Sequence, residues 1–364
     1  DGRDAFLAEV RADYEKIRVQ HSQKSGPGPL LALAEARRLG LKTDWGVYRP
    51  PKPRRTGVIA LADFPLAQLV PYIDWSPFFQ AWELSGSYPR ILEDPVVGSE
   101  ARKLLAEGRA MLARAVAERW IIANGVLALY PAAQVDDDDI EIYADEERRT
   151  RLITWHNLRQ QSRKPQGRPN LCLADFVAPK ASGVHDWVGG FAVCTDGYDE
   201  RVHRFEASHD DYNAIMLKVL ADRLAEAFAE RLHERVRREF WGYAADEDLT
   251  TEKLVAEAYR GIRPAPGYPA CPDHVPKGAL FRLLQAERHA GMRLTESFAM
   301  LPASSVAGFY LSHPEAAYFA VGKIGRDQVE DYARRSGCAL GEAERWLAPN
   351  LGYEPHRPLA SASL

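Results

Sequence analysis

The stretch YNAIMLKVLADRLAEAFAERLHERVRREFW, residues 212–241, is the clearest structural element of this 364-residue sequence. Its apolar residues recur at every fourth position: Met216, Leu220, Leu224, Phe228, Leu232, Val236 and Phe240. On a helix of 3.6 residues per turn, this spacing makes one slowly winding apolar stripe. Asp210 and Asp211 precede the stretch, where carboxylates complement the helix dipole. The pattern predicts a long helix with its stripe buried against the rest of the fold.

Shorter elements flank this helix without a regular strand–helix alternation. Strands are predicted at Ile140–Tyr143, Thr150–Asn157, Leu171–Val177 and Trp187–Cys194, and as an antiparallel meander at Leu294–Met300, Val306–Ser312 and Ala317–Lys323. Helices are predicted at Glu100–Asn124, Thr251–Arg260, Pro276–Ala290, Arg326–Ser336 and Gly341–Leu347. We therefore expect an α+β fold, a single domain with a central twisted antiparallel sheet flanked by helices and preceded by a helical linker.

The N-terminal segment is punctuated by Gly and Pro. Phe6–Gln23 has a charged amphipathic pattern that Ser25-Gly-Pro-Gly-Pro29 interrupts, and a second helical run, Leu30–Leu39, ends at Gly40. We predict a helical linker over residues 1–45, one body over 46–354 and a flexible tail over 355–364. Because the sequence begins with Asp1, we expect it to derive from a longer chain.

Bulk composition argues against several classes of partner. The formal charge is -4 and the isoelectric point is near 6.3, whereas nucleic-acid-binding surfaces are usually basic. The longest apolar stretch, Ile121–Ala133, contains Asn124 and is shorter than the ~20 residues of a membrane span. The four cysteines are scattered, which favours a reducing compartment. We expect a cytoplasmic protein with no nucleic-acid or membrane partner.

Common catalytic and metal motifs are missing from the sequence. It has no G-x-S-x-G elbow, no P-loop, no G-x-G-x-x-G after a strand and no H-E-x-x-H. Cys271 and His274 lie three residues apart, but no second pair accompanies them. The cobalamin-ligating pattern D-x-H-x-x-G is also absent. We expect no metal site and no catalytic side chain.

Chemistry-bearing residues concentrate in the segment Tyr259–His274. Its prolines lock the backbone and remove donors, so Pro264–Pro272 is predicted to be a stiff irregular loop. Gly267 permits close approach of the backbone to another group. A rigid loop that carries Arg263, Gly267 and Tyr268 suits a small ligand, although a structural turn with a surface arginine fits these residues equally well.

At this loop the sequence resembles a known family. Arg263-Pro-Ala-Pro-Gly-Tyr268 is similar to the R-x-x-x-G-Y signature of the reactivation domain of cobalamin-dependent methionine synthase. Other stretches also match that family's pattern: Tyr72–Phe79, Tyr88–Leu92, Leu173–Lys180, His209–Asn213, Leu294–Met300, Arg326–Ala333 and Glu344–Tyr353. The resemblance covers residues 45–354 and implies a domain that binds S-adenosylmethionine.

The resemblance also implies roles for individual residues. Arg263 would meet the ligand carboxylate in a two-pronged fork, and Asp74 would take the amino group. The other residues expected to contact the ligand are Ala265, Gly267, Tyr268, Tyr318, Phe319, Glu226 and Glu257. Phe319 departs from the family, where Tyr is frequent. His274 is expected to face the cobalamin-bearing partner.

Each of these assignments has a structural alternative. Asp74 fits a helix cap before Trp75, and on strand periodicity alone Tyr318 and Phe319 fit core positions. Glu226 and Glu257 fit solvated helix faces.

The family's reaction needs positioning more than catalytic side chains. The resemblance implies reductive methylation of oxidised cobalamin held by a partner domain, with S-adenosylmethionine as methyl donor and flavodoxin or an equivalent as electron donor. The resemblance also implies that zinc is bound only by the homocysteine domain of the full enzyme. Two alternatives remain: a partner platform that binds S-adenosylmethionine without reactivation activity, and a separate small-molecule methyltransferase.

Overall fold

The structure is a computed structural model that describes residues 28–355. The predicted helix Phe6–Gln23 and almost all of the predicted tail lie outside the described residues. By their contacts, the described residues form two compact units. The smaller unit contains residues 28–41, 158–172 and 320–355, and the larger contains 42–157 and 173–319. The predicted boundaries at 45 and 354 stay a prediction.

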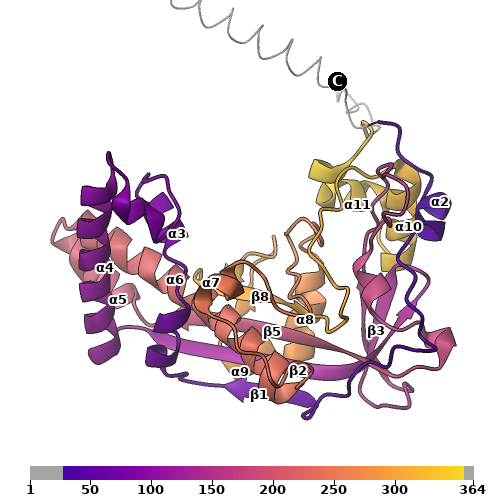
Figure 1. Cartoon of the computed structure of the whole chain (residues 1–364), viewed down its shortest axis with the longest axis horizontal. Coiled ribbons are helices and arrows are strands. Elements are labelled where there is room, and N and C mark those ends of the chain that lie inside the picture. The colour runs from indigo at the N-terminus through magenta and orange to yellow at the C-terminus, as the bar shows by residue number, and fades with distance from the viewer. Residues whose placement is uncertain (1–27, 356–364) are drawn as a thin grey trace, which may run out of the picture. The chain divides into compact units, whose positions relative to one another are not determined.

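An antiparallel sheet of six strands forms the centre of the larger unit (Figure 1). Its strands are β1 (Gly57–Leu61), β2 (Ile122–Val135), β3 (Asp139–Tyr143), β4 (Arg151–His156), β5 (Asp186–Asp196) and β8 (Ser305–Tyr310). The order is β4-β3-β2-β5-β8, and β1 pairs with β2 on the edge that β2 also offers to β3. This arrangement is possible because β2 is 14 residues long: residues 125–129 pair with β1 and 132–135 with β3.

Helices cover both faces of this sheet. Adjacent residues of a strand point to opposite faces. On β5, Thr195 donates a hydrogen bond to the carbonyl of Ala221 in α6 (Asp211–Arg235), while Cys194 donates to that of Ala290 in α9 (Ala286–Ala290). A sheet covered on both faces has continuous apolar strands, and Val126 to Leu129 of β2 are accordingly fully buried.

The long helix is the main packing element on its face. All seven stripe residues predicted from the sequence are buried, and the helix extends into a π-helical turn at Val236–Phe240. Asp210 caps it by accepting from the backbone of Asn213. Helices α4 (Gly98–Ala117) and α5 (Asp199–Ala207) pack against α6 (Figure 1). The other helices of this unit are α3 (Ser76–Gln80), α7 (Thr251–Val255) and α8 (Pro276–Leu284).

The smaller unit is helical. It contains α2 (Leu33–Arg38), α10 (Arg326–Ser336) and α11 (Leu340–Trp346). The backbone amide of Leu33 donates to Asp327, and Arg37 pairs with Asp331 at 2.7 Å, so α2 is bonded to α10. Short 3-10 helices in the two units lie at Leu66–Gln68, Val70–Tyr72, Arg90–Glu93, Leu173–Phe176, Lys180–Ser182 and Ala348–Asn350.

Several predicted elements are wrong in type or length. Pro276–Ala290 is two helices, because Gln285 adopts a left-handed conformation (φ +49°). The helix predicted to reach Arg260 ends at Val255, before Glu257 at φ +55°. Leu171–Val177 contains a 3-10 helix, and residues 317–323 form no strand. The predicted meander is absent from the described residues: β6 (Arg293–Leu294) pairs with β7 (Met300–Leu301), whereas β8 pairs with β5. The α+β class with a helix-flanked antiparallel sheet is confirmed.

Candidate functional site

The proline-rich loop is attached to the free edge of β8. Ile262 and Leu311 exchange two backbone hydrogen bonds of 2.9 and 3.0 Å, and Phe309 donates to the carbonyl of Pro264 at 2.9 Å. Gly308 allows this approach, because a Cβ there would lie 2.7 Å from the Pro264 oxygen. The sheet edge therefore holds the loop at Arg263, and β8 itself packs against α6.

The loop then turns tightly at Gly267. This residue has φ +98°, and its amide donates to the carbonyl of Cys271 at 2.7 Å. A Cβ on Gly267 would lie 2.2 Å from Cε1 of His274. Both the backbone angle and the neighbouring imidazole thus demand glycine here. The next residue, Tyr268, is 60% exposed.

Arg263 does not point into solvent. Its Nη2 donates to Oε2 of Glu230 at 2.6 Å, and its Nη1 donates to Nδ1 of His233 at 3.2 Å and to the hydroxyl of Tyr259 at 2.9 Å. A guanidinium has five N–H donors. The Nε hydrogen and the second Nη2 hydrogen are left without an acceptor among residues 28–355.

Burial and neighbouring charges shift the pKa values of both Arg263 and His233. Burial works to lower the pKa of Arg263, but the charge of Glu230, its hydrogen bond and the nearby Tyr259 and Tyr318 together outweigh burial, so the pKa is raised. Burial lowers the pKa of His233 well below its usual value, and the positive charges of Arg237 and Arg263 add to the effect. His233 is therefore neutral, with Nδ1 as acceptor and the proton on Nε2.

Two tyrosines complete the surroundings of Arg263. The hydroxyl of Tyr318 accepts from the backbone amide of Arg263 at 2.9 Å and lies 3.3 Å from the hydroxyl of Tyr259. Tyr318 is 37% exposed and belongs to no strand, so the alternative of a strand core position is wrong for it. Phe319, the next residue, is half-buried.

The two predicted helix carboxylates lie near the loop. Partial burial raises the pKa of Tyr268, and the charge of Glu226 raises it further, while Arg223 and Arg263 oppose the shift. Burial also raises the pKa of Glu257, against the charge of Arg263 and with that of Glu230. These interactions put Glu226 within electrostatic range of Tyr268, and Glu257 within that of Arg263. Both carboxylates are exposed.

Two other predicted residues have local partners. Oδ1 of Asp74 accepts from the backbone amide of Ser76, the first residue of α3, at 2.9 Å, while Trp75 occupies the cap position. His274 lies over Gly267, and its Nδ1 is 3.0 Å from Nζ of Lys277. Burial and the charge of Lys277 lower the pKa of His274. A lysine can only donate, so Nδ1 of His274 is the acceptor and its proton is on Nε2.

Sequence reasoning missed Glu230, Tyr259 and the role of His233. A signal was available: Glu226, Glu230, His233 and Arg237 are spaced four, three and four residues apart, which puts them on one helix face. Arg237 is fully buried in a bidentate pair with Glu247. Glu230 and His233 are buried on this face and need an interior partner, and Arg263 is that partner.

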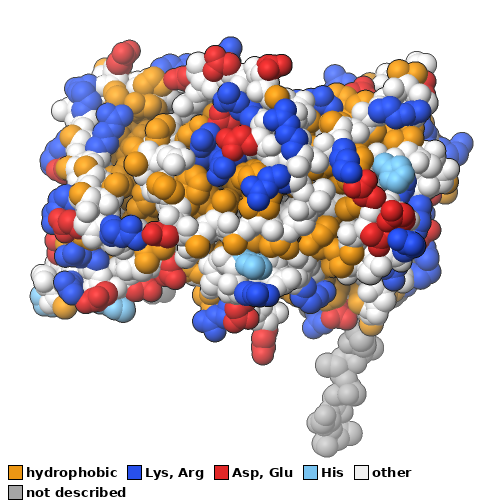
Figure 2. All heavy atoms as spheres, turned by 90° about the horizontal axis from the view of Figure 1, so that it is seen from below, with side chains coloured by type: hydrophobic (Ala, Val, Ile, Leu, Met, Phe, Trp, Pro, Cys, Tyr) orange, Lys and Arg blue, Asp and Glu red, His pale blue; other side chains and the backbone are white. Residues whose placement is uncertain are grey.

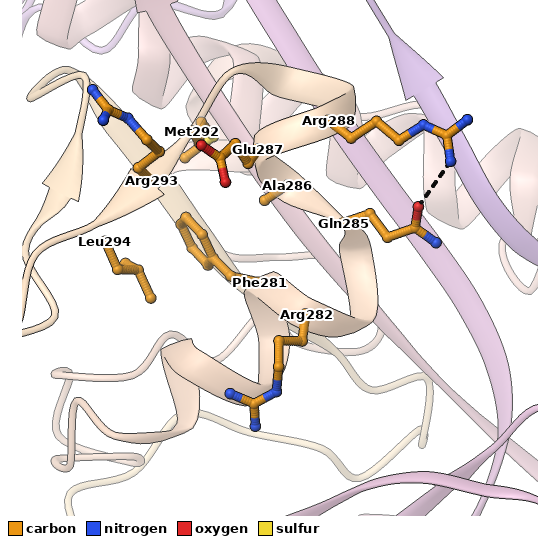
Figure 3. Close-up of a pocket in the computed structure, with 9 residues that line it drawn as sticks. All are labelled: Phe281, Arg282, Gln285, Ala286, Glu287, Arg288, Met292, Arg293 and Leu294. Atoms are coloured by element: carbon orange, nitrogen blue, oxygen red, sulfur yellow. Dashed lines mark hydrogen bonds between the residues drawn. The ribbon is translucent and has the colours of Figure 1, made fainter.

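A separate hollow of about 700 Å³ lies between α8, α9 and β6 (Figure 3). Phe281 and Met292 contribute apolar surface, and Arg282, Arg288 and Arg293 carry charge at its rim. None of the predicted site residues lines it. Figure 2 shows charges of both signs interspersed with apolar side chains on the face it draws.

Comparison with known proteins decides the family. The family model described as "Vitamin B12 dependent methionine synthase, activation domain" matches residues 65–337. The chain belongs to this family. A solved structure, described as the MetH reactivation domain bound to AdoHcy, is 55% identical to this chain. It covers 90% of this chain and 100% of its own length, with a TM-score of 0.87. The family resemblance found in the sequence is thereby confirmed, and this activation domain has the fold of that reactivation domain.

Two further findings concern membrane-spanning helices and metal sites in this activation domain. Within residues 28–355, no helix combines the length and apolarity needed to cross a membrane. No group of three or more His, Cys, Asp or Glu residues is placed to hold a metal ion in the same part of the chain.

Proposed function

We propose that this activation domain binds S-adenosylmethionine and presents its methyl group to a cobalamin held by the cobalamin-binding domain of methionine synthase. The observation that carries the proposal is the Arg263 guanidinium, which is oriented by three acceptors and keeps two N–H donors for a ligand. AdoHcy, which the 55% identical domain binds, is S-adenosylmethionine without its methyl group.

The residues fit the parts of this ligand. The two donors of Arg263 suit the carboxylate in a charge-assisted fork. Asp74 would take the ammonium with the oxygen that does not accept from Ser76, and the backbone at Ala265 and Gly267 would meet the adenosine. The rim would consist of Tyr268, Tyr318, Phe319, Glu226 and Glu257. Tyr318 holds the Arg263 backbone, so it also supports the loop.

The chain's own part in methyl transfer is positioning. Cobalamin, when bound to its own domain, supplies the nucleophilic cobalt that accepts the methyl group, after an electron from flavodoxin or an equivalent donor. The sulfonium is already a good leaving group, so no general base is needed. Tyr268 and His274 present exposed side chains at the loop, and His274 would face the partner. We further propose that the domain works in the cytoplasm.

Calorimetry on the full chain tests whether it binds the proposed ligand. Wild type should bind S-adenosylmethionine and S-adenosylhomocysteine, and Arg263→Ala should weaken both by about 30-fold or more, since a charge-assisted pair is removed. Arg326→Ala, which removes an exposed arginine paired with Glu330, is the matched control. No binding by wild type would refute the proposal.

A second assay separates the remaining alternatives. With the cobalamin-binding domain and a reductant, wild type should form methylcobalamin from S-adenosylmethionine, and Arg263→Ala should slow this step. A platform without reactivation activity would bind the ligand and yield no methylcobalamin. A small-molecule methyltransferase would need an enclosed substrate pocket, and the hollow of Figure 3 contains none of the site residues.

A further inference from the structure

We infer that Glu230 is a positioning residue that orients Arg263 for carboxylate recognition. The inference rests on the proposed function, because it assumes that Arg263 receives the carboxylate of the ligand. Glu230 is 9% exposed and stands on α6, 33 residues before Arg263. Its Oε2 accepts from Nη2 of Arg263 at 2.6 Å, the shortest of the three hydrogen bonds of the guanidinium.

An arginine side chain needs such support to bind a carboxylate well. It has several rotatable bonds, and freezing them on binding costs about 0.5–1.5 kcal/mol for each such side chain. Here the Arg263 side chain is already held in one conformation by its contacts within the protein. Glu230 and His233 lie one turn apart on α6, and Tyr259 precedes the loop, so the acceptors come from two directions.

These contacts also select which donors stay available. Both Nη1 hydrogens go to His233 and Tyr259, and Glu230 takes only one Nη2 hydrogen. The Nε and Nη2 groups that keep a hydrogen are neighbours on one edge of the guanidinium. A guanidinium can form two parallel hydrogen bonds with a carboxylate through either of two edges, and the contacts of Nη1 leave the Nε/Nη2 edge for the ligand.

The negative charge of Glu230 explains why Arg263 stays folded inward. An unpaired buried guanidinium is strongly unfavourable, so the carboxylate stabilises it within the protein. The second oxygen of Glu230, Oε1, is buried without a hydrogen-bond partner among the described residues. Arg263 is therefore the hydrogen-bond partner that the Glu230 carboxylate has among the described residues.

The test compares two ligands on the full chain. S-adenosylmethionine carries the carboxylate, and decarboxylated S-adenosylmethionine keeps everything else. Glu230→Ala should weaken binding of S-adenosylmethionine by about tenfold or more, because the orienting bond to a charged group is lost. The same change should leave the affinity for the decarboxylated ligand within about twofold, since that ligand makes no use of the fork.

A conservative variant and a control complete the design. Glu230→Gln keeps an oxygen that accepts from Nη2 but removes the charge, so its affinity for S-adenosylmethionine should lie between those of wild type and Glu230→Ala. Asp331→Ala removes a carboxylate of the smaller unit whose side chain is as exposed as that of Glu230, 12%, and should change neither affinity.

Three results would overturn the inference. They are an unchanged affinity of Glu230→Ala for S-adenosylmethionine, an equal loss for both ligands, or a Gln variant as weak as the Ala variant. If wild type binds and Arg263→Ala does not, these results count against Glu230 alone. Failure of wild type to bind would instead refute the proposed function.

Discussion

Arg263 and Glu230 form a largely buried ion pair of 2.6 Å between the proline-rich loop and the long helix α6. The loop brings the arginine to the edge of the sheet, and the helix supplies the carboxylate and the neutral His233 that orient it. Arg263 is thus already hydrogen-bonded to the protein on one side, before any ligand binds.

Gly267→Ala should disrupt the loop and the ligand site together. The new Cβ would lie 2.2 Å from His274 in a backbone conformation of φ +98°, so we expect a loss of about 1–3 kcal/mol in the free energy of unfolding. S-adenosylhomocysteine binding should fall by about tenfold or more. Denaturant unfolding and calorimetry measure the two effects. Gly183→Ala is the matched control, because Gly183 also has a positive φ (+69°) but no atom within 4 Å of a new Cβ. Equal effects of the two substitutions on ligand binding would contradict the prediction.

Tyr318→Phe should weaken ligand binding through the backbone of Arg263. The change removes the hydroxyl that accepts from the Arg263 amide at 2.9 Å. Loss of one such bond should reduce the affinity for S-adenosylhomocysteine about fivefold to tenfold, as measured by calorimetry. Tyr353→Phe removes a comparable hydroxyl, bonded to Glu344 in the smaller unit, and should leave the affinity unchanged. An unaltered affinity of the Tyr318 variant would show that this hydroxyl does not support the loop.

Stability should fall as the solution becomes acidic, partly through His313. This side chain is 2% exposed, and burial, with the charge of Arg260, lowers its pKa from 6.5 to about 4. Its Nδ1 accepts from the amide of Glu315 at 3.1 Å, and its Nε2 pairs with Thr43. Because the folded pKa is the lower one, the unfolded chain binds the proton more readily. The contribution of neutral His313 to the free energy of unfolding is complete above pH 6.5, and it is lost as the pH falls towards 4.

His313→Asn should flatten that acid dependence. The amide oxygen of Asn can still accept from Glu315, and Asn does not titrate. We expect unfolding free energies measured between pH 7 and 4.5 to fall about 1–3 kcal/mol less in the variant than in wild type. His203→Asn, at an exposed position of α5, controls for the removal of one histidine. Identical pH profiles for wild type and the His313 variant would refute this prediction.

Glu247→Gln should be strongly destabilising. Glu247 accepts from Nε and Nη2 of Arg237 at 2.7–2.9 Å, and the Arg237 side chain is fully buried. Breaking a buried pair by neutralising one partner leaves an uncompensated charge and costs about 3–5 kcal/mol. Denaturant unfolding should show this loss. Glu330→Gln, which breaks an exposed pair with Arg326, should cost less than about 0.5 kcal/mol, and a similar small cost at Glu247 would contradict the prediction.

Much of the fold and the family could be predicted from the sequence, because those signals are local. The stripe from Met216 to Phe240 depends only on helical spacing, and all of its residues are buried as predicted. The signature Arg263–Tyr268 is contiguous, so it indicated the family and the loop directly. Local signals failed where single residues changed the backbone. Gln285 breaks one helix at φ +49°, and neither its size nor its chemistry demands that conformation.

Only the tertiary structure decided how the candidate site is assembled. Glu230 and Arg263 are 33 residues apart, and they meet because the loop pairs with the edge of β8 while α6 packs beside that strand. Such a contact depends on the path of the chain through the fold, and no repeating pattern in the sequence indicates it. The sequence by itself therefore determined the family, the fold class and the loop that carries the signature. The packing of sheet edge against helix decided which side chains orient Arg263, because a largely buried charge is stable only beside a compensating partner.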